Sequence, residues 1–167
     1  MVGELTFFLG FKIWQCSSGI FLSQGKYARN LITKFGLNKA KPKRTPVVLH
    51  LKLLKDDSGE RVDESLYRSI IGSLLHLTIS RPDITFTVGV CARYQASPRI
   101  SHLHFDERIL KYVLGTTEYG FSYTYDTSSA LVGLCDTDWV GCLDDRKSTS
   151  GGCFFLGNNL TAWFNKK

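Results

Sequence analysis

Four carboxylates lie close together in the stretch LCDTDWVGCLDDRKSTSGGCFFLG, namely Asp136, Asp138, Asp144 and Asp145. Because side chains on a strand alternate between its two faces, Asp136 and Asp138 would point to the same face. Carboxylate oxygens are hard ligands that suit Mg²⁺, and two-metal nucleases and polymerases use them to hold ions around a phosphodiester. The spacing therefore makes Asp136 and Asp138 candidate metal ligands.

A structural explanation fits the same residues. An Asp-x-Asp pattern is short and common, and it is also found at a solvated strand end. Asp144 and Asp145 are followed at once by Arg146 and Lys147, which can pair with them in a turn. Spacing alone leaves both interpretations open.

The positive charge of the chain is concentrated in its first third. The net charge is +6, and residues 1–50 carry eight Lys or Arg and one Glu. A basic block beside aromatic residues suits a phosphate backbone, although a solvated basic surface gives the same pattern. The candidate nucleic-acid-binding residues are Gly10, Lys12, Lys26, Arg29, Lys41, Lys43 and Arg44. Gly10 would allow close approach of a ligand, and a tight turn explains it equally well.

Composition excludes several classes of protein. The chain has 167 residues, 43% of them hydrophobic, which suits one domain or a domain with part of a neighbour. No apolar run is long enough for a bilayer and the N-terminus lacks a signal peptide, so we expect no membrane partner and an intracellular, non-secreted protein of unknown compartment. Five cysteines without a C-x-x-C pair argue against a disulfide framework or a zinc site. His102 and His104 are interpreted as a solvated pair near a helix start.

Hydrophobic periodicity predicts the elements that would position these residues. Apolar runs on either side of WQCSSG predict a β-hairpin, and SQGKYARNLITKFG predicts a helix capped by Ser23 and ended by Gly36. The following segment, rich in Lys and Pro, is predicted to be a basic loop.

Three further helices are predicted in the middle of the chain. One begins after the cap Asp63 and ends before Pro82, the next begins at Pro82, and the last is capped by Ser101 and ended by Gly115. After Gly115 the period changes to two, which indicates strands in YGFSYTYD, ALVGLCDTDW, GGCFFLG and NLTAWF. The sequence therefore predicts an α+β fold.

Several sequence motifs of the chain resemble those of a known family. LYRSIIGSLLHLTISRPDITFTVGVCARYQASP, SHLHFDERILKYVLGT and DDRKSTSGGCFFLGNN closely resemble the Pol polyprotein of copia-type long-terminal-repeat retrotransposons, which are abundant in plants. FFLGFKI, GIFLSQGKYARNLITKFGL and KPKRTP do so as well. The resemblance covers essentially the whole chain, with the motifs in the order of the family.

The resemblance implies a fragment with three segments. Residues 1–23 would be the end of a reverse transcriptase palm with a primer-grip-like hairpin, 24–118 a helical thumb or connection, and 119–167 the first strands of an incomplete, mixed ribonuclease H-like sheet. RNA–DNA hybrid or DNA duplex and the remainder of the Pol polyprotein are the implied partners. LCDTDW would place Asp136 at the catalytic, metal-binding aspartate, with Asp138 as the second candidate.

The resemblance also implies that catalytic groups are missing. The Tyr-x-Asp-Asp hairpin of the polymerase and the catalytic Glu of ribonuclease H would both lie outside this sequence. We therefore expect no polymerase or ribonuclease H activity from the chain alone, and Mg²⁺ only where the site is complete. The alternatives are a non-catalytic nucleic-acid-binding module or a relic without function. The last predicted helix departs from the family pattern HLxAVKRILRYL, because Phe105, Asp106 and Glu107 replace small or basic residues.

Overall fold

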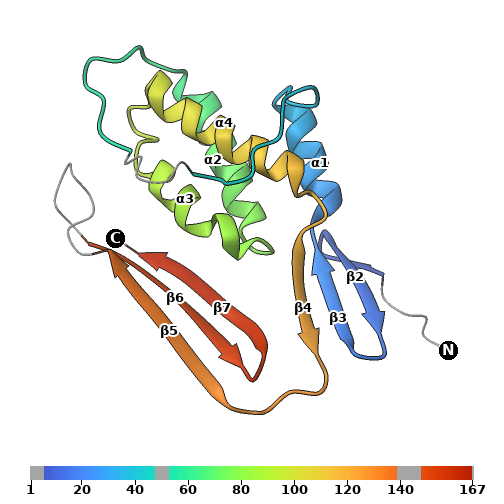
Figure 1. The fold of residues 1–167 in the computed structure, drawn as a ribbon. Coiled ribbons are helices and arrows are strands. Elements are labelled where there is room, and N and C mark those ends of the chain that lie inside the picture. The colour runs from blue at the N-terminus through green and yellow to red at the C-terminus, as the bar shows by residue number, and fades with distance from the viewer. Residues whose placement is uncertain (1–5, 48–52, 139–147, 167) are drawn as a thin grey trace.

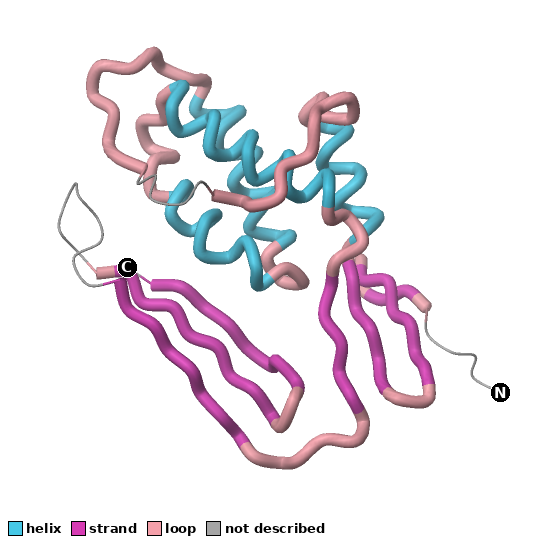
Figure 2. Tube along the Cα trace, viewed as in Figure 1, coloured by secondary structure: helices cyan, strands magenta, loops and turns pink. Residues whose placement is uncertain are grey.

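The computed structural model describes residues 6–47, 53–138 and 148–166 and shows helices on one side of two antiparallel sheets (Figures 1 and 2). The elements in chain order are β1 (Phe7–Phe8), β2 (Phe11–Cys16), β3 (Gly19–Ser23), α1 (Gly25–Lys34), α2 (Glu64–Leu77), α3 (Pro82–Ala92), α4 (Ile100–Gly115), β4 (Gly120–Thr124), β5 (Leu131–Asp138), β6 (Thr149–Leu156) and β7 (Asn159–Lys166). The predicted α+β class is confirmed at this level. None of the helices in the described ranges is long and apolar enough to cross a membrane.

The first sheet has the order β1-β2-β3-β4 and joins the two ends of the helical region. Its predicted hairpin is present as β2 and β3. The first apolar run forms both β1 and the start of β2, and Leu9 and Gly10 between them have the positive φ that a two-residue hairpin turn requires. β4 pairs with β3 in the register Ser23↔Gly120. A strand of the predicted third segment thus completes the sheet of the first, and the three-segment division itself stays a prediction.

The hydrophobic core lies between the four helices. Its fully buried members include Leu31 and Ile32 of α1, Tyr67 and Leu74 of α2, and Val113 of α4. The helical spacing predicted the core side of α1 and most of α2. In α2, the helical spacing also predicts that Leu66 and Leu75 flank the apolar stripe, but both are more than 40% exposed and Leu77 is buried instead. The buried face is therefore narrower than the apolar pattern.

The second sheet, β5-β6-β7, packs against α3 and meets the first sheet through β4. Asn159, at the start of β7, accepts from the Thr124 backbone N–H at 2.8 Å and donates to its carbonyl at 3.0 Å. Trp163 donates its indole N–H to the Thr78 carbonyl at 3.0 Å and packs edge-on against Phe121. These contacts fix the second sheet relative to the helices.

Helix boundaries show where local signals succeed and fail. Asp63 caps α2 by accepting from the Ser65 backbone N–H at 2.8 Å, and Gly36 has the positive φ expected after α1. Ser23 is not a cap, because it is the last residue of β3 and Gln24 precedes the helix. Ser101 is not a cap either: its hydroxyl donates to Asp56, and Arg99 precedes α4.

The predicted solvated histidine pair is wrong for one of its two members. His104 is exposed, but His102 is 1% exposed and stacks on Tyr94. Its Nδ1 accepts from the Arg99 backbone N–H at 3.1 Å, and its Nε2 pairs with the Leu54 carbonyl at 2.9 Å. His102 thus ties the start of α4 to the preceding loop.

Candidate functional site

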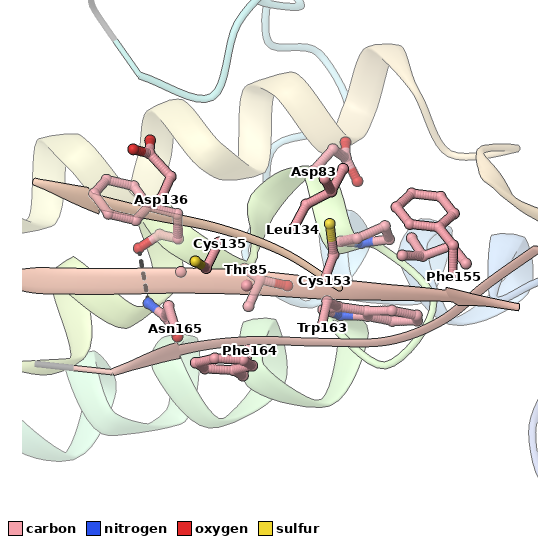
Figure 3. Close-up of a pocket in the computed structure, with 15 residues that line it drawn as sticks. Asp83, Thr85, Leu134, Cys135, Asp136, Cys153, Phe155, Trp163, Phe164 and Asn165 are labelled. Carbon is pink, nitrogen blue, oxygen red and sulfur yellow. Dashed lines mark hydrogen bonds between the residues drawn. The ribbon is translucent and has the colours of Figure 1, made fainter. Parts of the chain in front are cut away.

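An open pocket of about 430 Å³ lies between α3 and the face of the second sheet that points toward the helices (Figure 3). In the close-up, Asp136 and Asn165 lie at one end and Phe155 at the other, with Trp163 and Cys153 between them. Most of the lining is apolar or aromatic. The pocket therefore offers a hydrophobic floor with carboxylates at its margin.

Asp136 reaches this face through the sheet register. It is paired with Gly151 on β6, and Gly151 is paired with Asn165 on β7, so the three residues form one row across the sheet. Asp136 is exposed to solvent, and the Asn165 amide donates to the Phe86 carbonyl at 3.4 Å. Gly151 has no side chain, which leaves the space beside Asp136 open. A ligand can therefore approach the Asp136 carboxylate from solvent.

The described side chains around Asp136 do not make a magnesium site by themselves. Among the described residues, no group of three or more His, Cys, Asp or Glu converges as a metal site. Asp138 is in β5, but its side chain lies outside the described part, as do Asp144 and Asp145. Mg²⁺ needs several oxygen ligands in near-octahedral geometry. The row supplies one carboxylate and one amide, too few to hold the ion.

Arg81 and Asp83 form a charged pair at the margin of the pocket that sequence reasoning missed. The Arg81 side chain is 2% exposed, and its Nε and Nη2 donate to the two Asp83 oxygens at 2.9 and 2.7 Å. It also donates to the carbonyl and hydroxyl of Thr116. Its guanidinium lies over the rings of Tyr112 and Tyr119, at 5.4 and 5.3 Å from their centres.

This pair joins the start of α3 to the end of α4. The Tyr112 hydroxyl donates to Asp83 at 2.8 Å. Burial raises the pKa of Asp83, but its hydrogen bonds with Arg81 and the charge of Arg81 outweigh that effect and hold the pKa below its ordinary value. The available signal was an Arg directly before the Pro at a helix start, with an Asp directly after it.

Three of the predicted nucleic-acid-binding side chains gather where β2 meets the start of α1. Lys12 is paired with Ser23, the last residue of β3, and Lys26 lies in the first turn of α1. Arg29 follows one turn later and forms an exposed ion pair with Glu118. Lys12, Lys26 and Arg29 are all exposed. The predicted Gly10 lies nearby in the β1–β2 turn, where its positive φ gives it a structural role.

The other three predicted basic side chains lie in a segment that runs along α4. The backbone N–H of Lys43 donates to the Lys111 carbonyl at 3.0 Å, and Pro42 lies against Gly115. The Thr45 hydroxyl accepts from Arg108 at 2.9 Å. Lys41, Lys43 and Arg44 therefore sit on an anchored backbone with exposed side chains. In the described part of the chain, no carboxylate pairs with them or with Lys12 and Lys26.

Comparison of the sequence with those of known proteins places this chain in a family. An uncharacterized mitochondrial protein of Arabidopsis thaliana is 36% identical over 166 residues, which cover 99% of this chain and 69% of that protein. The retrovirus-related Pol polyprotein from transposon RE1 of the same plant is 34% identical over 164 residues. The corresponding polyprotein from transposon TNT 1-94 of Nicotiana tabacum is 34% identical over 168 residues. The chain belongs to the Pol polyprotein family of copia-type retrotransposons.

The match covers nearly all of this chain but only a small part of the copia-type polyproteins. It covers 98% of this chain but 11% of the RE1 polyprotein, and 95% of this chain but 12% of the TNT 1-94 polyprotein. The chain thus corresponds to about a tenth of these relatives. No family model matches it, and no solved structure matches it.

Proposed function

We propose that this chain is a nucleic-acid-handling segment from the reverse transcriptase and ribonuclease H region of a copia-type Pol polyprotein. Its partner is an RNA–DNA hybrid or a DNA duplex. The observation that carries the proposal is the set of exposed basic side chains on α1, β2 and the segment along α4, most of which have no carboxylate partner among the described residues. A surface Lys that lacks a carboxylate partner is available to a phosphate.

The anchoring of the basic residues supports binding. Lys43 and Arg44 lie on a backbone that is tied to α4, and Lys12 lies on a paired strand. Charges on a fixed backbone lose less conformational entropy on binding than charges on a free tail. The aromatic residues Phe7 and Trp14 are on the same face of the first sheet as Lys12 and are 52% and 64% exposed.

Binding rather than cleavage is the activity proposed for this chain by itself. Two-metal hydrolysis needs several carboxylates around two ions, and the described residues provide Asp136 alone on its row. The finer proposal is that β5–β7 are strands of a ribonuclease H-like sheet. Asp136 would then be one metal ligand of a centre that other parts of the polyprotein complete, and Mg²⁺ would bind only there.

Fluorescence anisotropy with a labelled RNA–DNA hybrid tests the binding proposal. The triple variant Lys41→Ala, Lys43→Ala, Arg44→Ala should bind more weakly than the wild type. Its plot of log K against log salt concentration should also be shallower, by about 0.9 for each phosphate that the variant no longer neutralises. The matched control is Lys55→Ala, Arg68→Ala, Lys166→Ala, which removes the same charge elsewhere.

Equal reductions of affinity in both triple variants would mean that net charge alone causes the binding, and the proposed interface would be wrong. Asp136 is tested separately. In the complete polyprotein, Asp136→Asn should abolish cleavage of the RNA strand in a hybrid. In this chain the same change should leave hybrid affinity unchanged. If the Asp136→Asn polyprotein still cleaves the RNA strand, the proposed metal-binding role of Asp136 is wrong.

A further inference from the structure

A carboxylate is buried in the helical core without a hydrogen-bond partner. Asp106 of α4 is 0% exposed, and neither of its oxygens accepts a hydrogen bond with good geometry. No cation pairs with it among the described residues. A buried group of this kind is costly, and the cost is far larger for the charged form than for the neutral acid.

The side chains that surround Asp106 offset only part of this cost, because burial raises the pKa of Asp106 by more than Cys91 and Tyr67 lower it. α2 contributes Tyr67, whose hydroxyl donates to the Cys91 carbonyl at 3.0 Å and is thereby engaged. α3 contributes the Cys91 thiol, which is a weak donor. Both lie within electrostatic reach of Asp106, although neither completes a well-aligned hydrogen bond. The buried side chains of α1 are apolar.

The charged and titratable neighbours along α4 are engaged elsewhere. His102, one turn earlier, has both ring nitrogens paired, and it stacks on Tyr94, which interacts electrostatically with Tyr67. Arg108 donates to Thr45 through Nη2, and its Nε is buried without a hydrogen-bond partner but does not pair with Asp106. Glu107 pairs with Lys111 near the surface. The core is therefore complementary to the protonated acid and not to the carboxylate.

α4 also holds other parts of the molecule in place. It anchors the basic segment through Lys111 and Arg108, and it contacts the Arg81–Asp83 pair through Tyr112. From this geometry we infer that Asp106 is a pH-sensitive switch within the fold. The neutral acid lets α4 close on α2 and α3, and ionisation loosens α4 together with the basic segment that it carries.

The direction of the effect follows from burial. Burial raises the pKa of Asp106 to about 7 from an ordinary value of 3.8. Between these two pKa values the unfolded chain is ionised and the folded chain is not, so the free energy of unfolding falls as the pH rises from about 3.8 to about 7. The helical core should therefore be more stable at pH 5 than at pH 8.5.

Two measurements test the switch on the wild-type chain. The ¹³Cγ resonance of Asp106 should titrate with a midpoint near 7. The thermal midpoint should fall by roughly 5–10 °C between pH 5 and pH 8.5, because the unfolded chain is ionised throughout this range whereas the folded chain keeps the Asp106 proton up to about pH 7. Unfolding at pH 8.5 that is reversed at pH 5 would support the inference in the same way.

Three variants separate the switch from a general effect of pH. Asp106→Val and Asp106→Asn should lose most of the pH dependence, whereas Glu107→Gln, the neighbouring carboxyl, should retain it. A titration midpoint near 4, or parallel pH curves for the wild type and Asp106→Val, would overturn the inference. So would a wild type that is unfolded at both pH values while Asp106→Val is folded at both. Because these readouts need no nucleic acid, they stand apart from the test of the proposed function.

Discussion

At the scale of single residues, Arg81 shows how a charge can be buried without the cost that Asp106 carries. All three of its guanidinium nitrogens donate hydrogen bonds, and Asp83 supplies the opposite charge. Lysine cannot reproduce this arrangement, because its single ammonium group has no planar fork and cannot reach both Asp83 and Thr116. This arrangement of hydrogen bonds therefore requires Arg at position 81.

We expect Arg81→Lys to lower the free energy of unfolding by about 3 kcal/mol, the usual cost of breaking a buried ion pair. Chemical denaturation at neutral pH measures it. The matched control is Arg68→Lys, because Arg68 forms an exposed ion pair with Glu64 and should lose less than about 0.5 kcal/mol. Similar decreases in the two variants would show that the buried network has no special weight.

At the scale of elements, two glycines with opposite surroundings test how tightly helices and strands are packed. Gly72 lies on the exposed side of α2, and a Cβ there would meet nothing within 4 Å. Gly120 begins β4, where a Cβ would overlap the backbone carbonyl of Leu22 on β3. The same substitution should therefore have opposite effects.

Gly72→Ala should raise the free energy of unfolding by about 1 kcal/mol through helix propensity. Gly120→Ala should lower it by about 1–3 kcal/mol, because β3 and β4 must separate to admit the methyl group. Urea denaturation of both variants gives the comparison. Stabilisation by both changes would mean that β4 is not closely paired with β3.

The helices could be predicted from sequence because their signals are local. The period of apolar residues and the cap at Asp63 need no knowledge of the rest of the chain. Ser23 and Ser101 misled the prediction because each interacts with a residue distant in sequence instead of capping a helix. Ser23 pairs with β4, and Ser101 donates to Asp56. The burial of His102 likewise depends on the Leu54 carbonyl, 48 residues away.

The candidate site residues also divide into those that local sequence signals predict and those that depend on contacts distant in sequence. The exposure of the basic side chains follows from their type, and the row through Asp136 follows from strand periodicity once β5 is placed. Arg81, Asp83 and Tyr112 could not be assembled from sequence, because their contact depends on how α3 and α4 cross. Asp106 was visible as a departure from the family pattern, but only the packing shows that it is buried.

At the scale of the whole molecule, Trp163 links the second sheet to the helices. Trp163→Ala should lower the free energy of unfolding by about 3 kcal/mol, since it removes a packed ring and the hydrogen bond to Thr78. In the Trp163→Ala variant, amide hydrogen exchange should accelerate more in β5–β7 than in the helices. Trp14→Ala is the control, because Trp14 is 64% exposed and should cost less than about 1 kcal/mol.

The pairing of β3 with β4 has a consequence for the order in which the molecule forms. Their paired residues are roughly a hundred positions apart in the chain, whereas β5 pairs with β6 and β6 pairs with β7, the next strand in each case. Closing so long a loop is slow. During synthesis on a ribosome, the N-terminal hairpin must therefore wait with one side open until Thr124 has emerged. The C-terminal meander faces no such delay.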